Sequence, residues 1–568
     1  MRKNQQIADA LHEIADLLEL EDIQFKPRAY HRAAEAIEGL ADDIEDLAKQ
    51  DKLEEIPGVG KSIAEKIIEF LKTGRIKHLE ELRRKTPVKV KELEEIEGVG
   101  PKTVKKLYNA LKVKTLQDLE NAAKTGKIRS LKGFTEATDQ RILEGIKFHE
   151  GHKGRMLLGV ALPLAEEIIA QLKRCKDIEQ ISLGGSLNRK AETIGDIDIL
   201  VAAKRSKPVM DFFTSMDDLR KVLAKGETKS SIQLKSGTQV DLRVVDPKSW
   251  GAALQYFTGS KMHNIKVRQL AIKKGYKLNE YGLFKNENAI AARTEEEVYA
   301  KLGMQTPSPE MREDKGEVEL ALNHKLPILV NEKDIKGDFH VHSTWSDGSA
   351  SILQMAQAAK QQGRSYFVQT DHTGKLKIAG GMEPKAIERY IKEIDAINKK
   401  LNGFRILKGV EVNIEEDGSP DIKDTILKKL DIVVGSVHWG FKGTREALTK
   451  RLMKALEHPH IHILGHPTGR LLQEREGYEL DFERVFDTAR ERGKVLEINA
   501  QPARLDLNDD HVREAVKRGV KLAISTDAHH PDHFRYMRYG VYVARRGWCE
   551  KKDIINCMPV EKVLKLFH

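Results

Sequence analysis

The sequence predicts a multidomain protein that combines α and α/β folds. Its 568 residues correspond to three or four domains at about 150 residues each. Apolar residues recur at helical spacing up to about residue 150, and strand-like segments then appear among the helical ones. From about residue 336, short apolar strands alternate with helical stretches. We therefore expect a helical N-terminal part, a mixed α/β middle part and a C-terminal, distorted β/α barrel.

The composition is typical of globular domains rather than of a secreted or membrane-spanning chain. Cys175, Cys549 and Cys557 form no CxxC pair, so neither a disulfide framework nor a thiolate zinc site is expected. No run of about 18 apolar residues occurs, and the N-terminus lacks the apolar core of a signal peptide. We expect a cytoplasmic protein without a membrane partner. The net charge of +10 favours a polyanionic partner where basic residues cluster, and a mixed solvated surface is the alternative.

The helical part, residues 1–150, contains a weak internal repeat. A glycine hairpin occurs at 56–60 (IPGVG) and at 96–100 (IEGVG), each before an amphipathic helix, and 131–134 (LKGF) resembles a third, degraded copy. A Gly-x-Gly turn exposes backbone N–H groups beside the positive end of the next helix, and these hold a phosphate without contacting bases. We predict non-specific binding of the DNA backbone, with ordinary helix turns as the alternative. The predicted DNA-binding residues are Gly58, Gly60, Lys61, Gly98, Gly100 and Lys102.

Lys66 lies on the helix that follows the first hairpin. A lysine whose pKa is lowered by neighbouring cations acts as a Schiff-base nucleophile in some enzymes. The local sequence alone favours a solvated or phosphate-contacting lysine instead.

The first motif that indicates a function in the middle part, about 150–310, is a glycine turn. A predicted strand ends at Leu183, and the turn Gly184–Ser186 follows it directly. The backbone and hydroxyl of such a turn wrap around a phosphate, and Arg189 adds positive charge nearby. This turn predicts a phosphate-binding site.

Three aspartates accompany the turn. Asp196 and Asp198 are two residues apart on a predicted strand and therefore point to one face, and Asp241 lies on another strand. Adjacent carboxylates repel one another unless divalent cations lie between them. Three carboxylates suit two Mg²⁺ ions (or Mn²⁺) about 3.5–4 Å apart, which hold the attacking and leaving oxygens of a phosphoryl transfer. The combination predicts nucleotidyl transfer.

The C-terminal part follows a polar boundary with two prolines, Gln305–Lys315. Its alternation of strands and helices predicts a parallel barrel with its chemistry at the strand ends. The predicted strands are 366–370, 410–414, 432–437, 461–465, 495–499 and 522–525.

Acidic and histidine residues end or follow these strands. They are His340, His342, Asp347, His372, Glu411, His438, His466, Asp527 and His529. Nine candidate ligands at such regular positions predict a polynuclear metal site, and its imidazole-rich set suits Mn²⁺ or Zn²⁺. His460 and His462, which are close in sequence to His466, are predicted to be surface residues.

The first 310 residues resemble DNA polymerase beta and the family X DNA polymerases. The motifs that carry the resemblance are GGSLNRK with GDIDI, QVDLR, YFTGS and the two GVG hairpins. The resemblance implies two helix-hairpin-helix domains, a nucleotidyltransferase palm, a nucleotide-selection (thumb) subdomain and a linker. Their implied bounds are 1–85 for a lyase-like domain of the 8-kDa type, 86–150 for a fingers-like DNA-binding domain, 151–245 for the palm, 246–310 for the thumb and 311–335 for the linker.

The resemblance also implies roles for single residues. Asp196, Asp198 and Asp241 would ligate the two metals, with Asp241 near the primer 3′ hydroxyl. Lys66 matches the lyase lysine of the family. This match gives the Schiff-base interpretation the same weight as a solvated or phosphate-contacting lysine. The implied nucleotide-binding residues are Gly185, Ser186, Arg189, Gly195, Tyr256, Phe257, Gly259 and Asn264, and the implied DNA contacts include Arg243 and Arg268.

Two positions depart from the family pattern. The Arg-Gly pair expected after the glycine turn is Arg189-Lys190 here, and the basic residue expected two positions before the third aspartate is Gln239. Both departures leave the carboxylates intact.

Residues 336–568 resemble the PHP (polymerase and histidinol phosphatase) domain, and all nine ligand positions of that family are filled. The resemblance implies a trinuclear site in which Glu411 bridges two metals. The implied sets are His340, His342, Glu411 and Asp527; Glu411, His438 and His466; and Asp347, His372 and His529.

A family X core joined to a PHP domain resembles the bacterial and archaeal family X polymerases. The implied function is DNA-directed synthesis that fills short gaps in base excision repair, by a monomer acting on gapped or primer-template DNA with dNTPs. A 3′–5′ exonuclease in the PHP domain and cleavage at abasic sites are also implied. The alternatives are a polymerase with a purely structural PHP domain, a DNA-end-binding repair scaffold and a phosphatase of small metabolites. The intact ligand set argues against a purely structural PHP domain. The aspartates argue against a scaffold, and the hairpins argue against a phosphatase of small metabolites.

Overall fold

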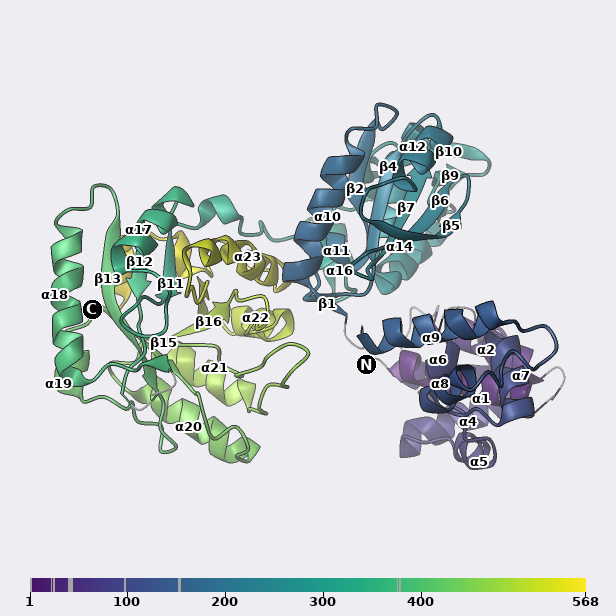
Figure 1. Ribbon diagram of the computed structural model, residues 1–568, viewed down its shortest axis with the longest axis horizontal. Coiled ribbons are helices and arrows are strands. Elements are labelled where there is room, and N and C mark those ends of the chain that lie inside the picture. The colour runs from purple at the N-terminus through teal and green to yellow at the C-terminus, as the bar shows by residue number, and fades with distance from the viewer. Residues whose placement is uncertain are drawn as a thin grey trace. The chain divides into compact units, whose positions relative to one another are not determined.

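The computed structural model describes residues 3–21, 23, 26–38, 44–94, 96, 99–151, 155–374, 376 and 379–567. The chain divides into two compact units, Met1–Gly154 and Arg155–His568. Figure 1 labels their elements. No helix in the described ranges combines the length and the apolar content that crossing a membrane requires.

The N-terminal unit consists of helices joined by turns wherever it is described. Its helices are α1 (Lys3–Leu20), α2 (Lys26–Glu38), α3 (Ile44–Lys49), α4 (Lys61–Thr73), α5 (Lys77–Lys85), α6 (Val90–Glu94), α7 (Pro101–Leu111), α8 (Leu116–Lys124) and α9 (Glu136–Gly151), with a 3-10 turn at Leu53–Glu55. Ile7, Leu11 and Ile14 of α1 belong to one apolar core, as their three- and four-residue spacing predicts. The predicted helical fold of this part is confirmed.

The second unit begins with a five-stranded sheet of order β2-β4-β7-β6-β5. Its elements are β1 (Met156–Leu157), α10 (Leu158–Leu172), β2 (Gln180–Leu183), α11 (Gly185–Asn188), β3 (Thr193–Ile194), β4 (Ile197–Ala202), α12 (Ser206–Phe213), β5 (Leu219–Lys225), β6 (Lys229–Leu234) and β7 (Gln239–Val245). Strands β4 and β7 are parallel, and the other neighbours are antiparallel. The β4–β7 register places Asp198 opposite Asp241, so two predicted carboxylates lie side by side.

A smaller layer with its own core follows. It contains a 3-10 turn at Pro247–Ser249, α13 (Trp250–Thr258), α14 (Lys261–Lys273), an antiparallel sheet of β8 (Lys277–Asn279), β9 (Gly282–Lys285) and β10 (Asn288–Ala291), α15 (Glu295–Lys301), a 3-10 turn at Pro309–Met311 and α16 (Glu317–Leu322). Together with the first sheet, it gives the mixed α/β middle part that the sequence predicts.

The polar segment predicted to be a boundary, Gln305–Lys315, is packed rather than free. Val318 and Ala321 of α16, inside the predicted linker, belong to the core of the small layer. The Arg312 side chain is buried and pairs with Glu295 at 2.5 Å, and the Glu317 carboxylate contacts His263 at 2.7 Å. The polar residues of this segment are therefore paired inside the fold, Arg312 with a carboxylate and Glu317 with an imidazole.

The C-terminal part is a seven-stranded parallel sheet of order β11-β12-β13-β14-β15-β16-β17. The strands are β11 (Gly337–Val341), β12 (Tyr366–Gln369), β13 (Arg405–Asn413), β14 (Ile432–Ser436), β15 (Ile463–Leu464), β16 (Val495–Asn499) and β17 (Lys521–Ser525). A parallel bridge between Val341 and Ala528 nearly closes the ring. The predicted distorted barrel is confirmed, although β15 is shorter than expected.

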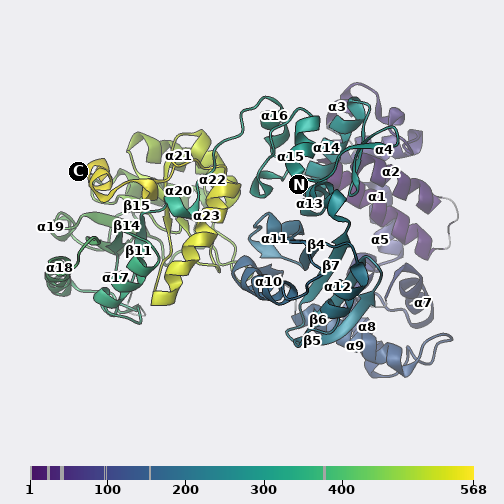
Figure 2. The ribbon, with the colours of Figure 1, turned by 90° about the horizontal axis from the view of Figure 1, so that it is seen from above.

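Helices surround these strands (Figures 1 and 2). They are α17 (Ile352–Gln361), α18 (Pro384–Asn398), α19 (Asp424–Leu427), α20 (Arg445–Glu457), α21 (Phe482–Glu491), α22 (Asp509–Lys517), α23 (Met537–Arg546) and α24 (Val560–Phe567), with 3-10 turns at Glu332–Asp334, Pro531–Tyr536 and Ile555–Cys557. The prediction that His462 is a surface residue is wrong. It is buried, its ring lies 5.1 Å from that of Phe567, and its Nδ1 accepts a hydrogen bond from the Val433 N–H. It precedes β15, at the opposite end of this strand from His466.

Candidate metal centres and DNA contacts

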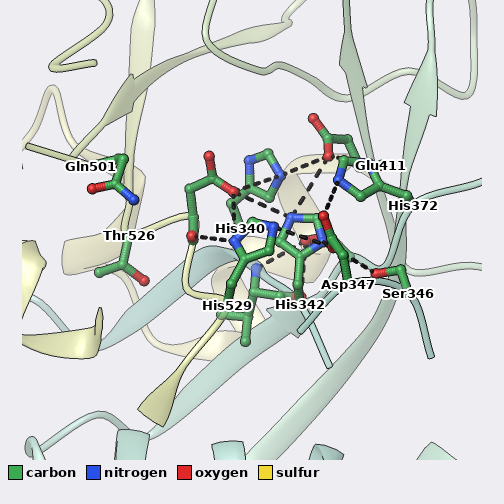
Figure 3. Close-up of polar contacts among 12 residues, drawn as sticks. His340, His342, Ser346, Asp347, His372, Glu411, Gln501, Thr526 and His529 are labelled. Carbon is green, nitrogen blue, oxygen red and sulfur yellow. Dashed lines mark hydrogen bonds and ion pairs between the residues drawn. The ribbon is translucent and has the colours of Figure 1, made fainter. Parts of the chain in front are cut away.

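Nine side chains gather at the carboxyl ends of the barrel strands. His340 and Glu411 lie near the ends of β11 and β13, and the others lie on the loops that follow strands. Figure 3 shows His340, His342, His372 and His529 turned toward one another and toward Glu411. The carboxyl ends of parallel strands meet at one rim of a barrel, which explains why residues up to about 190 positions apart in sequence meet here.

The Glu411 carboxylate occupies the centre of the group. One oxygen, Oε2, lies 2.8 Å from His372 Nδ1 and 3.3 Å from His340 Nε2. The other, Oε1, lies 3.1 Å from His466 Nε2 and 3.3 Å from His438 Nε2. Both oxygens therefore face ring nitrogens, as a bridging ligand requires.

The donor atoms form overlapping groups whose members lie within 4.8 Å of one another. The groups are His342, Asp347, His372 and His529; His340, His342 and Asp527; and His372, Glu411 and His438. The sequence resemblance implied a partition in which His342 and His372 each serve one metal. In the structure the ring centroids of these two histidines are 4.5 Å apart and each belongs to two of the groups, so the implied partition stays a prediction.

The histidines of this group differ in protonation preference. Although burial opposes it, neighbouring carboxylates raise the pKa of His340, His372 and His529, whereas the pKa of His342 falls. His342 is buried, and its burial and then the neighbouring His529 and His372 lower its pKa to about 3, so its ring is neutral. Its Nε2 makes no hydrogen bond. Burial opposes ionisation of Glu411, but His372 and His340 hold the pKa of this carboxyl well below its ordinary value. Neutral imidazoles and ionised carboxylates are the forms that bind metal ions.

A second layer of polar residues, which the sequence reasoning missed, orients the ligands. Glu497 Oε1 contacts His340 Nδ1 at 2.8 Å, while its Oε2 accepts hydrogen bonds from the His466 N–H at 2.6 Å and from Asn499 at 3.2 Å. Asn413 Oδ1 contacts His438 Nδ1 at 2.7 Å. Such partners fix the ring orientation and raise ligand basicity. Their signal in the sequence was a polar residue inside a strand that otherwise reads as apolar.

The three aspartates of the middle part lie at the beginnings of β4 and β7, where Asp198 is paired in register with Asp241. Asp196 immediately precedes β4 rather than lying on it. Burial and then the charges of Asp196 and Asp241 raise the pKa of Asp198 to about 6. Within the described residues, these carboxylates do not gather within 4.8 Å as the barrel ligands do. Carboxyl groups that resist ionisation because of one another are stabilised as anions when a divalent cation binds between them.

Gln239 departs from the family pattern, but positive charge reaches the third aspartate from another strand. Gln239 Nε2 donates to Asp241 Oδ1 at 2.9 Å, and Lys229 Nζ of β6 lies 2.6 Å from Asp241 Oδ2. Although burial opposes it, the hydrogen bond from Lys229 lowers the pKa of Asp241. This aspartate is therefore the most acidic of the three.

The glycine turn lies against the aspartates. Gly185 has φ +54°, and a Cβ there would lie 2.3 Å from Asp198 Oδ2, so only glycine allows this approach. Ser186 lies on the same turn, and Gly195 is exposed just before Asp196. Arg189 is held by Glu313 at 2.9 Å and donates to the Thr258 carbonyl at 2.7 Å.

The remaining predicted nucleotide and DNA contacts surround α13 and α14. The Arg243 guanidinium lies 4.5 Å from the ring centroid of Phe257, which meets Tyr256 edge-on at 5.1 Å. Asn264 is fixed between the Gln255 side chain and the Tyr256 carbonyl. Arg268 is exposed, and Gly259 has φ +69° at the end of α13.

The first glycine hairpin has the geometry that the repeat predicts. Helix α4 begins directly after Gly60, and Gly58 has φ +88° with the backbone of Ala33 3.2 Å from a Cβ placed there. Helix α7 begins after Gly100 in the same way. Gly98 lies outside the described residues. Lys61 and Lys102 are exposed at the starts of their helices.

Lys66 lines a pocket of about 780 Å³ together with Lys26, Tyr30, Lys61 and His78. Its Nζ lies 6.0 Å from the Tyr30 ring centroid and donates to the Ser62 hydroxyl and carbonyl at 3.1 Å. Burial and then the charge of Lys66 lower the pKa of His78. The pocket thus places other basic side chains near Lys66, which the sequence alone did not decide.

Comparisons with known proteins match several parts of this chain. Family models match a helix-hairpin-helix domain at 2–76, a SAM-like helix-hairpin-helix tandem at 90–147, the DNA polymerase beta thumb at 253–313 and the PHP domain at 338–501. The DNA polymerase/3'-5' exonuclease PolX of Bacillus subtilis (strain 168) is 37% identical over 558 residues, which are 97% of each chain. Probable phosphatases of Thermoanaerobacter sp. (strain X514) and Acetivibrio thermocellus are 34% and 31% identical, each over 34% of this chain and 78% of their own length.

Replacing Glu497 by Gln is expected to lower the metal affinity of the barrel by about 10–100-fold. Both carboxylate oxygens of Glu497 accept hydrogen bonds, and a glutamine amide offers only one acceptor oxygen. Titration of the metal-free protein with Mn²⁺ measures this affinity, with the exposed Glu491→Gln as the control. An affinity equal to that of the wild type would show that Glu497 does not orient the ligands.

Proposed function

Because the chain belongs to the family X DNA polymerases that carry a PHP domain, we propose that it fills short gaps in DNA during base excision repair. It is a DNA polymerase with a 3′–5′ exonuclease. The observation that carries the proposal is that one chain holds candidate metal ligands on the barrel, an aspartate pair in register on β4 and β7, and a family-matched helix-hairpin-helix domain. A cytoplasmic location and a monomeric state stay predictions.

For synthesis, we propose that Asp196, Asp198 and Asp241 hold two Mg²⁺ or Mn²⁺ ions. These ions would lower the charge that develops on the reacting phosphate oxygens. The Gly185–Ser186 turn and Arg189 bind the triphosphate of the dNTP, and Asp241, whose pKa is the lowest of the three, faces the primer 3′ hydroxyl. Tyr256, Phe257 and Asn264 border the incoming nucleotide, and the hairpin glycines and Lys61 bind the DNA backbone.

For hydrolysis, we propose that the nine barrel residues hold Mn²⁺ or Zn²⁺ ions, with Glu411 as the bridge. Such ions supply a bound water of lowered pKa and neutralise the phosphodiester. The neutral ring of His342 leaves a lone pair free for binding, while Glu497 and Asn413 keep His340 and His438 in fixed orientations. The similarity to probable phosphatases supports phosphoester cleavage by this barrel rather than a purely structural role.

Lys66 supports a second candidate activity, removal of the sugar phosphate left at an incised abasic site. The nucleophile would be the unprotonated Nζ, which attacks the aldehyde carbon and forms a Schiff base with loss of water. The Lys26 and Lys61 side chains that line the pocket suit the adjacent phosphate.

The double substitution Asp196→Ala plus Asp198→Ala is expected to abolish dNTP incorporation on gapped DNA but to leave Mn²⁺-dependent 3′ degradation. His340→Ala plus His342→Ala is expected to do the reverse, because the two sets of ligands are separate. Primer-extension and degradation assays on the same labelled DNA measure both activities. The exposed pair Asp217→Ala plus Asp218→Ala is the control. Loss of both activities in either double variant would refute two independent sites.

Borohydride reduction in the presence of incised abasic DNA is expected to trap a covalent adduct on the wild-type protein. Lys66→Ala should lose at least about nine-tenths of this adduct because the nucleophile is gone. Lys72→Ala, an exposed lysine on the same helix, should retain it. An undiminished adduct in Lys66→Ala would exclude Lys66 as the nucleophile.

A further inference from the structure

A pocket of about 570 Å³ lies beside the metal ligands of the barrel. Its walls are two loops that begin directly after ligands. Phe441 is three residues after His438, and Gly469 is three residues after His466. Three residues span at most about 11 Å, so the Cα atoms of Phe441 and Gly469 lie within about that distance of the Cα atoms of His438 and His466. The rest of the wall is Gly440, Lys442, Arg475, Glu476, Gly477 and Tyr478.

Aromatic and cationic groups are layered in this pocket. The rings of Phe441 and Tyr478 are nearly parallel, with centroids 5.8 Å apart, and the Arg475 guanidinium lies 4.4 Å from the Phe441 centroid. Arg475 is fixed there because its Nε and Nη2 donate to the Gly469 carbonyl at 3.0 and 2.6 Å. Gly469 has φ +61°, and a Cβ there would lie 3.0 Å from the Tyr478 ring. The layer is therefore rigid, while Arg475 is exposed and Phe441 is half-buried.

Contacts join the pocket to the metal ligands. The Leu472 N–H donates to the Ala503 carbonyl at 2.7 Å, and next to it Arg504 Nε lies 3.8 Å from Asp527 Oδ2. Burial and then the charge of the Arg504 guanidinium lower the pKa of Arg475. Arg475 on the pocket wall and Arg504 beside Asp527 both carry a positive charge that suits a nucleic-acid backbone.

We propose that this pocket binds the base of an unpaired 3′-terminal nucleotide, stacked on the layer formed by Phe441 and Arg475, while its phosphodiester faces the metal ligands. The proposal rests on the exonuclease function proposed above. Stacking on an aromatic ring accepts every base, because each has a π-face. The pocket accordingly selects for an unpaired end rather than for a sequence, since a paired base is not free to enter it.

The test compares two single-stranded oligonucleotides that differ only at the 3′ end. One ends in dA and the other ends in a base-free tetrahydrofuran residue. We expect the wild type to degrade the first with a kcat/KM about 10-fold higher or more, because stacking acts only on a base. In Phe441→Ala this ratio should fall to about 1, whereas Phe441→Tyr, which keeps a ring of similar size, should retain it.

Each outcome separates the pocket from the exonuclease itself. A ratio that is the same in the wild type and in Phe441→Ala would overturn the stacking pocket while leaving the metal site in place. Failure of the wild type to degrade either oligonucleotide would overturn both proposals. Equal Mn²⁺ binding by the wild type and Phe441→Ala shows that the metal ligands are undisturbed.

A separate observation concerns Glu313, which joins the two halves of the second unit. One oxygen of this carboxylate lies 2.9 Å from Arg189 Nε and 3.0 Å from Arg546 Nη1 of α23 in the barrel. Arg546 also donates to the Arg189 carbonyl at 2.9 Å and pairs with Asp509 at 2.8 Å. The Arg189 and Arg546 side chains are only 14% and 11% exposed, so solvent screens these contacts weakly.

Neighbouring residues fix α23 at the same place. Lys190, which departs from the family pattern, has φ +54°, and its Nζ lies 5.5 Å from the Tyr542 ring of α23. Arg545 pairs with Glu310 at 2.8 Å, and Arg538 pairs with Glu166. The barrel helix is therefore packed onto the turn that is proposed to bind the triphosphate.

We infer that Arg546 is a positioning residue for nucleotide binding, acting through Glu313 and the Arg189 backbone. Without Arg546, Glu313 pairs with Arg189 alone and holds its guanidinium away from the triphosphate more strongly. The inference rests on the proposed role of Arg189.

Arg546→Ala is expected to raise the KM for dNTP about 10-fold with a smaller change in kcat, and Arg546→Lys is expected to restore part of the loss. Arg545→Ala is the matched control because it removes an ion pair from the same interface without touching Arg189. Steady-state incorporation on gapped DNA measures both constants. Equal changes in the two alanine variants, or no change in either, would overturn the inference. If Asp196→Ala plus Asp198→Ala were still active, the proposed polymerase site itself would fail instead.

Discussion

The structure of the barrel site depends on one buried carboxylate, Glu411, which contacts ring nitrogens with both of its oxygens. A carboxylate in an apolar interior is costly unless positive charge or a metal faces it. Imidazoles from other strands surround the Glu411 carboxylate, so these strands have to end at the same rim of the barrel. The metal site and the parallel topology are therefore two consequences of the same requirement. A register slip of one residue would turn Glu411 to the other face of its strand.

The middle part meets a similar requirement by a different route. Asp198 and Asp241 are paired in register on two parallel strands, and their repulsion is partly offset by Lys229 from a third strand. Burial and then the charges of Asp196 and Asp241 raise the pKa of Asp198 to about 6, whereas His372 and His340 hold the pKa of the buried Glu411 well below its ordinary value. The middle site thus joins carboxylates that repel one another, whereas the barrel site joins a carboxylate and imidazoles that attract one another. This difference matches the different metals that we propose for the two sites.

Sequence patterns predicted these sites where the determinants were local. Alternation of apolar strands and helices predicted the barrel, and the two-residue spacing of His340 and His342 predicted their shared face. The sequence did not reveal the residues that act through contacts with distant positions in the chain. Glu497 contacts His340 from 157 positions away, and Arg546 reaches Arg189 from a helix near the C-terminus. The segment Gln305–Lys315 was interpreted as a boundary because a sequence shows that Arg312 is charged but not that Glu295 is beside it.

The contact between Lys190 and Tyr542 affects how the two halves of the second unit are inherited. The ammonium group of Lys190 is held in a largely buried site against an aromatic ring contributed by the barrel. Exchange of the barrel for one from a relative without an aromatic residue at that position would leave this ammonium group with the Leu187 carbonyl alone, 3.3 Å away. The two halves are consequently not interchangeable modules, and substitutions at these two positions are expected to be inherited together.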